Sequence, residues 1–482
     1  MAMDEQLSDS SSRRWEFLAY AYATVLAGLT AYFLFGLPVQ LSDSFANLLT
    51  IQSGSLWQVF RAQLGGGGYL RPLLQTQLKV VYELAGGHYF LWFRGVQAVQ
   101  VLVCLWLCVR MLQPRRLANL LVVPCALAIV LGLHTFAGTI YEAFPINTFL
   151  TLVICCLAAA NLARTSGGWL VDAAAAAVLV FSLLTLETGV LVWVILVAAR
   201  VAGARGVSTR SVVLVTAVLA GYVAWRTLYL HVGAPGFDER PTGFGFRVLE
   251  PSEVMARFKD HPLPFYVYNF GSALLTVLFG EPRGGVWRFA AGLSRGTVAP
   301  WQVINVVSST LTTCVLAWYI AKRAAAWARR SIRPDDLVVV LFLAVLPANA
   351  MLCIVYVKDV IMSPAGVFYA LAAAVALREL LTGTGHQRAA RSHALAAAVL
   401  VCVSALWGWR LLGIHYSLRA EAAKVRAEWA YEDEWEARNR ILISTAEGAA
   451  LKRTLLDDAI WRRPAPPRLD IGWADQAFDQ TQ

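Results

Sequence analysis

Residues 15–44 read WEFLAYAYATVLAGLTAYFLFGLPVQLSDS, an apolar segment of membrane-spanning length that ends in a short polar patch. A helix needs roughly 20 apolar residues to cross the hydrocarbon core of a bilayer. Asp43 comes soon after the segment, and a carboxylate near lipid is costly unless it faces a cavity and has a function there. This stretch therefore predicts a membrane helix followed by a candidate site at the lipid–water boundary.

Two further polar patches follow other apolar segments in the same way. One runs from His134 to Glu142, and the other is residues 185–189 (TLETG). Residues 69–73 (YLRPL) add a polar motif to the loop that begins at the first patch. Because acidic residues recur at such positions, we interpret the chain as a membrane-embedded enzyme with its site at one face of the membrane.

The composition excludes an ordinary soluble protein. Of the 482 residues, 58% are hydrophobic and only 15% are charged, and the mean hydropathy is +0.56. The net charge is +10, but the basic residues lie in short loops between apolar segments, where they set membrane orientation. We therefore expect no nucleic-acid partner.

The cysteines give no metal or disulfide framework. All eight lie inside apolar segments, and one pair is adjacent rather than spaced as CxxC: Cys104, Cys108, Cys125, Cys155, Cys156, Cys314, Cys353 and Cys402. We expect them to be small buried hydrophobic residues.

The hydropathy pattern predicts an all-α polytopic membrane protein of about eleven transmembrane helices. The predicted spans cover residues 15–37, 88–112, 117–136, 143–162, 169–186, 188–202, 211–230, 302–321, 336–357, 363–377 and 394–414. The first span follows a polar stretch without a small-residue cleavage site, so we expect a retained anchor rather than a signal peptide.

The basic residues predict the orientation of these spans. They are concentrated in the loops at one end: Arg13, Arg14, Arg115, Arg116, Arg164, Arg200, Arg205, Arg210, Lys322, Arg323, Arg329, Arg330, Arg333, Arg378, Arg388 and Arg391. Basic loops usually face the cytoplasm. We expect a cytoplasmic N-terminus, an extracytoplasmic C-terminus and all polar patches outside. The usage of Ala and Arg with few Lys is typical of a GC-rich bacterium, hence an inner (plasma) membrane.

This orientation places the basic loops on one side only if residues 263–280 do not cross the membrane alone. They are apolar enough to be a candidate span. We interpret them as a re-entrant or interfacial helix within one long outer loop, residues 231–301. The alternative is a crossing hairpin whose return leg lies within residues 287–300.

The other outer segments are expected to be helical. Within the first outer loop, residues 42–87, apolar residues from Phe45 to Phe60 recur at helical spacing and predict one surface helix. Four glycines at 65–68 break it, and a second helix is expected from Pro72. After the membrane domain, residues 1–414, the tail at 415–482 predicts a short helical extension.

Asp43 and Glu142 are the candidate acids. A carboxylate at the mouth of a membrane cavity can take a proton from a hydroxyl or amine acceptor. It can equally hold a divalent cation through oxygen, so a metal requirement is left open. The alternative for Asp43 is an N-cap for the helix at 45–52, with Ser42 or Ser44 as rival caps.

Arg71, Lys79 and Lys358 are candidates for binding a phosphate, since arginine offers a planar fork and lysine a point charge. Lys79 lies about two helical turns after Arg71. The alternative for Lys79 is contact with lipid headgroups, and Lys358 has an alternative ion pair with Asp359.

His134 precedes Glu142 by about two helical turns. A helix-end hydrogen bond is favoured over a ligand role, since a zinc site needs more ligands than the sequence places here. Arg94, Asp172 and Arg226 lie within or near span ends, where they either pair with one another or line the cavity.

In their order, these patches resemble the GT-C glycosyltransferases, most closely the protein O-mannosyltransferase-like branch. Asp43 matches the acidic residue that follows the first span. Residues 69–73 (YLRPL) resemble a Tyr-Arg-Pro-Leu-like motif, and His134 with Glu142 resembles a His-Pro motif followed by Glu. Residues 185–189 resemble Ser-Lys-Glu-x-Gly. The likeness extends to about Arg200, and Thr135 and Leu186 replace the Pro and Lys of the family.

The resemblance implies a membrane enzyme that moves a sugar from a polyprenyl-phosphate-linked donor to a glycan, lipid or protein acceptor on the extracytoplasmic face. Asp43 would be the general base, and Glu142 would orient donor or acceptor. Positioning and charge stabilisation would supply most of the acceleration, with inversion at the anomeric carbon.

The resemblance also implies supporting roles. The donor phosphate would be bound by Arg71, Lys358 and Lys79. The cavity wall would be supported by Glu187, His134 and Tyr69. Beyond the open question of a divalent cation, no cofactor is assigned, and membrane lipids surround the site.

Three other functions fit parts of the sequence. The first is a transporter. Transporters often show repeated halves and charges at the membrane midplane, whereas here the acids cluster at one boundary and the first half does not recur. A lipid-linked glycan polymerase or ligase would carry arginines in its long outer loop, as here: Arg240, Arg247, Arg257, Arg283, Arg288 and Arg295. The third alternative is a structural membrane scaffold.

Overall fold

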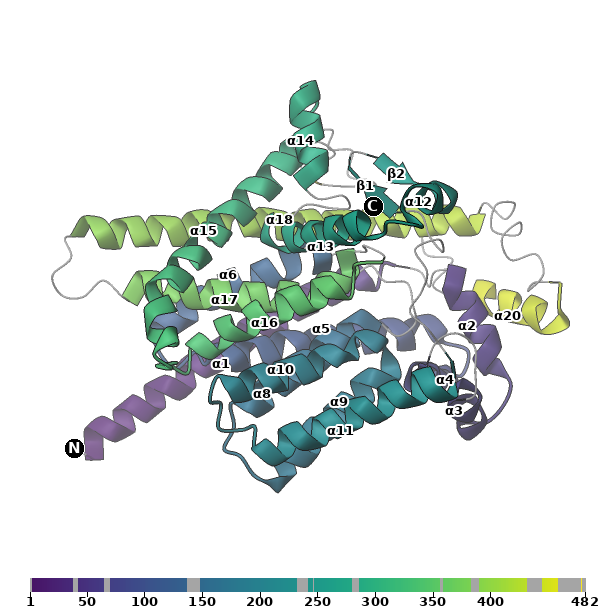
Figure 1. Ribbon diagram of the computed structural model, residues 1–482, viewed down its shortest axis with the longest axis horizontal. Helices are drawn as coiled ribbons and strands as arrows, with labels where there is room; N and C mark the ends of the chain where they lie inside the picture. The colour runs from purple at the N-terminus through teal and green to yellow at the C-terminus, as the bar shows by residue number, and fades with distance from the viewer. Residues whose placement is uncertain are drawn as a thin grey trace.

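The chain folds into an elongated bundle of helices that run mostly along its longest axis (Figure 1). This computed structural model describes residues 2–37, 42–64, 70–136, 148–231, 242–245, 247–279, 286–355, 359–382, 390–430, 444–457 and 478. Within these ranges the fold is helical, apart from one antiparallel hairpin of strands β1 (Thr242–Phe244) and β2 (Arg247–Leu249). The predicted helical class is confirmed.

Among the described residues, six helices are long and apolar enough to cross a membrane, by length and composition. They are Ser12–Leu34, Tyr89–Leu112, Thr209–Tyr229, Pro300–Ala328, Val360–Thr382 and Ala394–Leu418. They belong to α1 (Ala2–Leu34), α5 (Tyr89–Leu112), α11 (Thr209–Ala224) with the π-helical turn η2 (Trp225–Tyr229), α15 (Pro300–Ala328), η3 (Asp359–Met362) with α17 (Ser363–Thr382), and α18 (Ala390–Ala430). These helices indicate a protein integral to a membrane.

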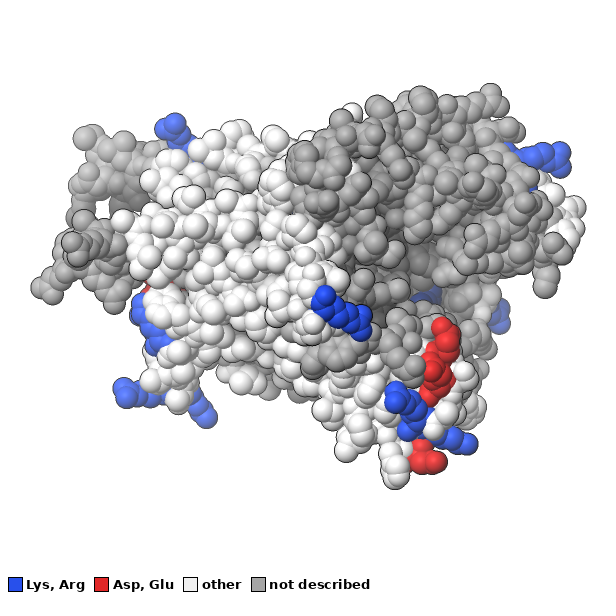
Figure 2. Space-filling view, turned by 90° about the horizontal axis from the view of Figure 1, so that it is seen from above, with Lys and Arg blue, Asp and Glu red and all other residues white. Residues whose placement is uncertain are grey.

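Shorter helices lie in the remaining predicted span ranges. They are α6 (Leu117–Gly132), α8 (Thr148–Ala163), α9 (Trp169–Thr185), α10 (Val190–Val201) and α16 (Asp336–Met351). Each of the predicted ranges thus contains a helix, while the number that cross the membrane stays a prediction. Large apolar side chains such as Phe17, Val201 and Leu395 are exposed on the bundle. Figure 2 shows a broad white surface with Lys and Arg side chains at its margins.

The helix α17 forms the centre of the bundle. Every side chain from Ser363 to Leu377 is buried, and α17 packs against α16, α6 and α15. Its many alanines let neighbouring backbones approach closely, as small residues do between membrane helices. Gly366 allows the closest approach, because a Cβ there would lie 2.6 Å from Thr135 Oγ1. The segment that carries His134 is therefore packed directly on α17.

The segment predicted to be re-entrant forms α13 (Leu263–Phe279), which packs against α15 and α16. Its buried face mixes polar and apolar residues, and Asn269 Nδ2 donates to the Ile354 carbonyl at 2.8 Å. The helix α13 therefore belongs to the bundle, and its re-entrant placement stays a prediction. The next helix, α14 (Val286–Arg295), lies in the return leg of the alternative hairpin. It has 10 residues, or about 15 Å, which is half of the hydrocarbon core.

The first outer loop contains two surface helices where the sequence predicted one between Phe45 and Phe60. They are α2 (Ser42–Gln52) and α3 (Leu56–Leu64). The break has a local cause: the Ser55 N–H donates to Gln58 Oε1 at 2.7 Å, and the Gln58 N–H donates to Ser55 Oγ at 3.3 Å. This reciprocal pair is a capping box that starts a new helix. The helix α4 (Pro72–Ala85) begins at Pro72 as predicted.

The C-terminal segment returns to the end of the bundle that carries the first outer loop. The helix α18 continues without a break through the predicted domain boundary at 414/415. Leu451 of α20 (Ala446–Asp457) is buried among side chains of α2 and α4 such as Leu48 and Leu78. The helix α12 (Pro251–Phe258), the β-hairpin and α20 all lie at this end, opposite the N-terminus (Figure 1).

Candidate functional site

The centre of the candidate site is an ion pair between two of the predicted motifs. Arg71 directly precedes α4, and Glu187 opens the 3₁₀ turn η1 (Glu187–Gly189) between α9 and α10. Arg71 Nε lies 3.1 and 2.9 Å from the two Glu187 carboxylate oxygens, and Nη2 lies 2.7 Å from Oε2. This paired geometry fixes the orientation of the guanidinium as well as its position.

A second arginine joins the same carboxylate. Arg226 lies in η2, and its Nη1 is 3.5 Å from Glu187 Oε1. The side chains of Arg71, Glu187 and Arg226 are 29%, 20% and 15% exposed, so all three are partly shielded from water. Among the described residues, two guanidiniums share this one carboxylate.

The turn that presents Glu187 depends on a glycine. A Cβ on Gly189 would lie 2.5 Å from the Ser182 carbonyl carbon. This distance is too short for any side chain unless the backbone moves. Ser182 Oγ donates to the Gly189 carbonyl at 3.2 Å and holds the turn against the last turns of α9. The TLETG sequence thus places Glu187 on a tight, packed turn.

Further polar contacts connect the helices around this ion pair. Gln77 Nε2 donates to Thr185 Oγ1 at 3.1 Å, which joins α4 to the end of α9. The hydroxyl of Tyr222, one turn before Arg226, lies within electrostatic range of both Arg226 and Glu187. The site is therefore built by α4, α9 and α11 together.

Asp43 lies in the first turn of α2, which begins at Ser42. One turn later on α2, Asn47 Oδ1 accepts from Gln75 Nε2 at 2.7 Å, and Gln75 lies one turn after Arg71. The helix that carries Asp43 is thus packed on the helix that follows Arg71.

Three predicted site residues, Tyr69, Glu142 and Lys358, lie outside the described residues. His134 is described and is buried at the end of α6, beside α17. In the part of the chain that the structure describes, no three His, Cys, Asp or Glu side chains come together as a metal-binding group.

Lys79 is buried rather than extended toward lipid headgroups. Its Nζ lies 3.3 Å from the Gln52 carbonyl oxygen and 3.2 Å from Glu83 Oε1, and it contacts the Tyr82 ring. The contact with Gln52 connects α4 to the end of α2, while Tyr82 and Glu83 lie on α4 itself. Lys79 therefore contributes to the packing of the first outer loop, and its role at the donor phosphate stays a prediction.

The three charged residues near span ends do not pair with one another. Arg94 is buried and donates to the Leu37 carbonyl at 2.9 Å. Asp172 accepts from Ser208 at 2.9 Å at the end of the bundle that carries the N-terminus. Arg226 reaches Glu187 and joins the site. The signal in the sequence was an arginine inside an apolar span, a place where charge usually marks function.

The cysteines match their expected role in part. Six are buried, whereas Cys314 and Cys402 are exposed, and every one is a free thiol.

Comparison with protein-family models, curated proteins and solved structures finds no match. The fold and the apolar helices define the class of the chain as a helical protein integral to a membrane.

Proposed function

We propose that the chain is an integral membrane glycosyltransferase of the GT-C type, which transfers a sugar from a polyprenyl-phosphate-linked donor to an acceptor outside the cytoplasm. The observation that supports it is the contact of Arg71 and Arg226 with Glu187. The sequence resemblance assigns Arg71 to the donor phosphate and Glu187 to the cavity wall. In the fold these two residues come from distant motifs and meet.

The ion pair supports phosphate binding because it fixes the orientation of two guanidiniums at one place. A guanidinium has five N–H groups, and Arg226 directs Nη1 at Glu187. Its further N–H groups can donate to the oxygens of a phosphate. A second anion is favoured there because, among the described residues, the two arginines exceed the one carboxylate by one positive charge.

The same contacts support the departure of the leaving group. In the proposed reaction the bond between the anomeric carbon and the phosphate oxygen breaks, and negative charge grows on polyprenyl phosphate. Fixed positive groups that face this charge stabilise the transition state, since they need no reorganisation during the reaction. Arg71 and Arg226 are held by Glu187 and packed helices, as such a role requires.

Asp43 is proposed as the base that takes the proton of the acceptor hydroxyl as its oxygen bonds to the anomeric carbon. One displacement then inverts that centre. Glu142 is proposed to orient the acceptor or donor, and Lys358 to bind the phosphate with Arg71. About eleven spans, a cytoplasmic N-terminus and a bacterial inner membrane complete the proposal.

The test is transfer of a radiolabelled sugar from polyprenyl-phosphate donors by the purified protein in proteoliposomes. Membrane extract supplies glycan, lipid and protein acceptors, and the labelled fraction identifies which one is used. We expect transfer that depends on the polyprenyl-phosphate donor. No transfer from any such donor, by protein that is folded and correctly inserted, would contradict the proposal.

A further inference from the structure

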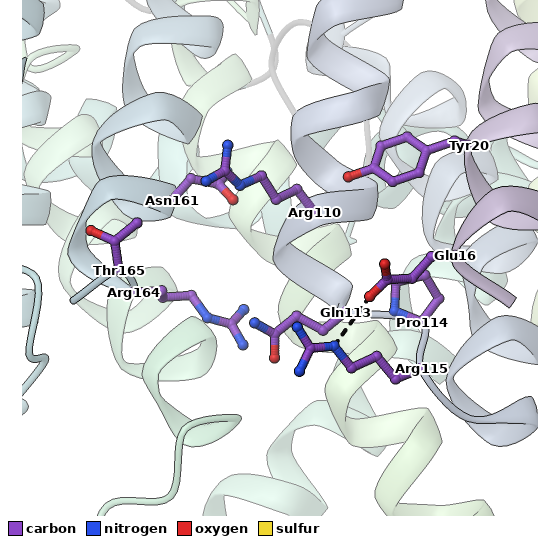
Figure 3. Close-up of a pocket in the computed structure, with 9 residues that line it drawn as sticks. All are labelled: Glu16, Tyr20, Arg110, Gln113, Pro114, Arg115, Asn161, Arg164 and Thr165. Atoms are coloured by element: carbon purple, nitrogen blue, oxygen red, sulfur yellow. Dashed lines mark hydrogen bonds and ion pairs between the residues drawn. The ribbon is translucent and has the colours of Figure 1, made fainter. Parts of the chain in front are cut away.

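A polar cavity lies toward the N-terminal end of the bundle, away from the Arg71 ion pair. It has a volume of about 410 Å³ and lies between α1, α5, the turn after α5, and the end of α8 (Figure 3). Its charged lining consists of Arg110, Arg115, Arg164 and Glu16. Three positive charges therefore face one negative charge.

The arginines of this cavity differ in what they bind. Arg115 Nε pairs with Glu16 at 3.1 Å, and Arg164 Nη1 donates to the Met111 carbonyl. No ion pair joins Arg110 to an acid among the described residues, and its side chain is exposed. Among the described residues, Arg110 is therefore a lining cation that has no carboxylate partner.

Neutral side chains lie beside these two arginines. Figure 3 shows the Arg110 guanidinium beside Asn161, and the Arg164 guanidinium facing the side chain of Gln113. Asn161 Nδ2 donates to the Leu157 and Leu107 carbonyls at 2.8 and 3.3 Å, so Gln113 supplies the amide donor of the cavity. Amide N–H groups and guanidiniums together form the donor set that surrounds a phosphate oxygen cluster in proteins.

The surroundings of Arg164 favour a bound anion. Burial lowers the pKa of the Arg164 guanidinium below its usual value. The carboxylate of Asp335 opposes this shift, whereas the positive charges of Arg378 and Arg115 add to it. An anion in the cavity would offset both the lost hydration and the repulsion.

Exposed apolar side chains lie next in sequence, or close in sequence, to the residues that line the cavity. Phe17 follows Glu16 and is 70% exposed, and Leu117 at the start of α6 is 52% exposed. Trp106 is also exposed, and its ring contacts the edge of Tyr20, a lining residue. A basic cavity whose rim is apolar fits a ligand with a charged head and hydrocarbon chains.

We propose that this cavity binds the phosphate headgroup of an anionic membrane phospholipid, with Arg110 and Arg164 on the phosphate and the amide of Gln113 on a neighbouring oxygen. The acyl chains lie along the exposed apolar faces of α1 and α6. This site is separate from the Arg71 ion pair and does not depend on the proposed glycosyl transfer.

The test is a titration of the purified full-length protein, in a nonionic detergent, with dioctanoyl phosphatidylglycerol, with lipid adducts counted by native mass spectrometry. Dioctanoyl phosphatidylcholine and inorganic phosphate are titrated in parallel. We expect one saturable phosphatidylglycerol site that Arg110→Gln weakens about tenfold, as loss of a charge-assisted hydrogen bond predicts. Arg110→Glu should abolish it, and the exposed Arg329→Gln should leave it unchanged.

Arg110 is the residue to change first. Its guanidinium is exposed and forms no ion pair with a described acid, so its replacement should leave folding intact. A circular dichroism spectrum and the melting temperature establish that each variant is folded. Equal binding by wild type and Arg110→Glu would overturn the proposal. Equal affinity for phosphatidylcholine would overturn the role of the anionic headgroup. Binding of inorganic phosphate as tight as that of the lipid would overturn the assignment to a lipid.

Discussion

Arg71 and Glu187 are 116 residues apart in the sequence, yet they form a bidentate ion pair with a shortest N–O distance of 2.7 Å. Arg71 comes from the first outer loop, and Glu187 from the turn between α9 and α10. The pair therefore connects two motifs that the sequence could only place in order along the chain. Arg226 extends the pair to α11 and makes Glu187 the shared contact of two cations.

Replacing Glu187 with Gln tests whether this shared carboxylate positions the arginines. The change keeps the size of the side chain but leaves two partly buried guanidiniums without their counter-charge. We expect a loss of about 1–3 kcal/mol in stability, the usual effect of losing a charge-assisted hydrogen bond, and a larger relative loss of transfer. Denaturant unfolding and the transfer assay measure the two effects. A variant with full activity would show that Glu187 does not orient the phosphate-binding residues.

Replacing Arg226 with Gln tests whether this residue, whose contact with Glu187 is seen in the fold, binds the donor phosphate. Loss of one guanidinium should raise the KM for the polyprenyl-phosphate donor about tenfold, and Arg226→Lys should recover part of that loss, since a point charge lacks the fork. The exposed Arg257 of α12 supplies the control, and Arg257→Gln should leave the donor KM unchanged. An unchanged donor KM in both Arg226 variants would remove this residue from the phosphate site.

Replacing Gly189 with Ala tests whether the tight turn sets the position of Glu187. The added methyl would meet the Ser182 backbone at 2.5 Å, and overpacking of this kind costs about 1–3 kcal/mol. Gly271 on α13 is the matched control, since a Cβ there meets no atom within 4 Å. We expect the melting temperature in detergent to fall for Gly189→Ala and not for Gly271→Ala. Equal melting temperatures would show that the turn tolerates a shift of its backbone.

The sequence predicted those features of the fold that depend on local pattern. Runs of apolar residues marked where helices lie, and Pro72 marked the start of α4, because a proline needs no N–H partner in a first turn. The break at residues 53–55 was missed because apolar spacing alone ignored the capping box of Ser55 and Gln58. A Ser-x-x-Gln pattern in the sequence was the signal.

The candidate site was predictable only in part, because its contacts join distant segments. Arg71 and Glu187 were selected for separate roles, and their direct contact depends on how α4 packs on α9. Lys79 was expected near phosphate or headgroups, but the packing of α2 on α4 buries it. Arg226 could be recognised as unusual in an apolar span, while its partner depended on the tertiary fold.

The most direct test of the account is sugar transfer by Asp43→Asn beside the wild type in proteoliposomes, with donor binding measured on the same samples. Asp172→Asn is the matched control, because Asp172 bonds to Ser208 near the other end of the bundle. The account predicts that Asp43→Asn loses transfer and keeps donor binding, while the control keeps both. Equal transfer by Asp43→Asn and wild type would contradict the assignment of Asp43 as the base.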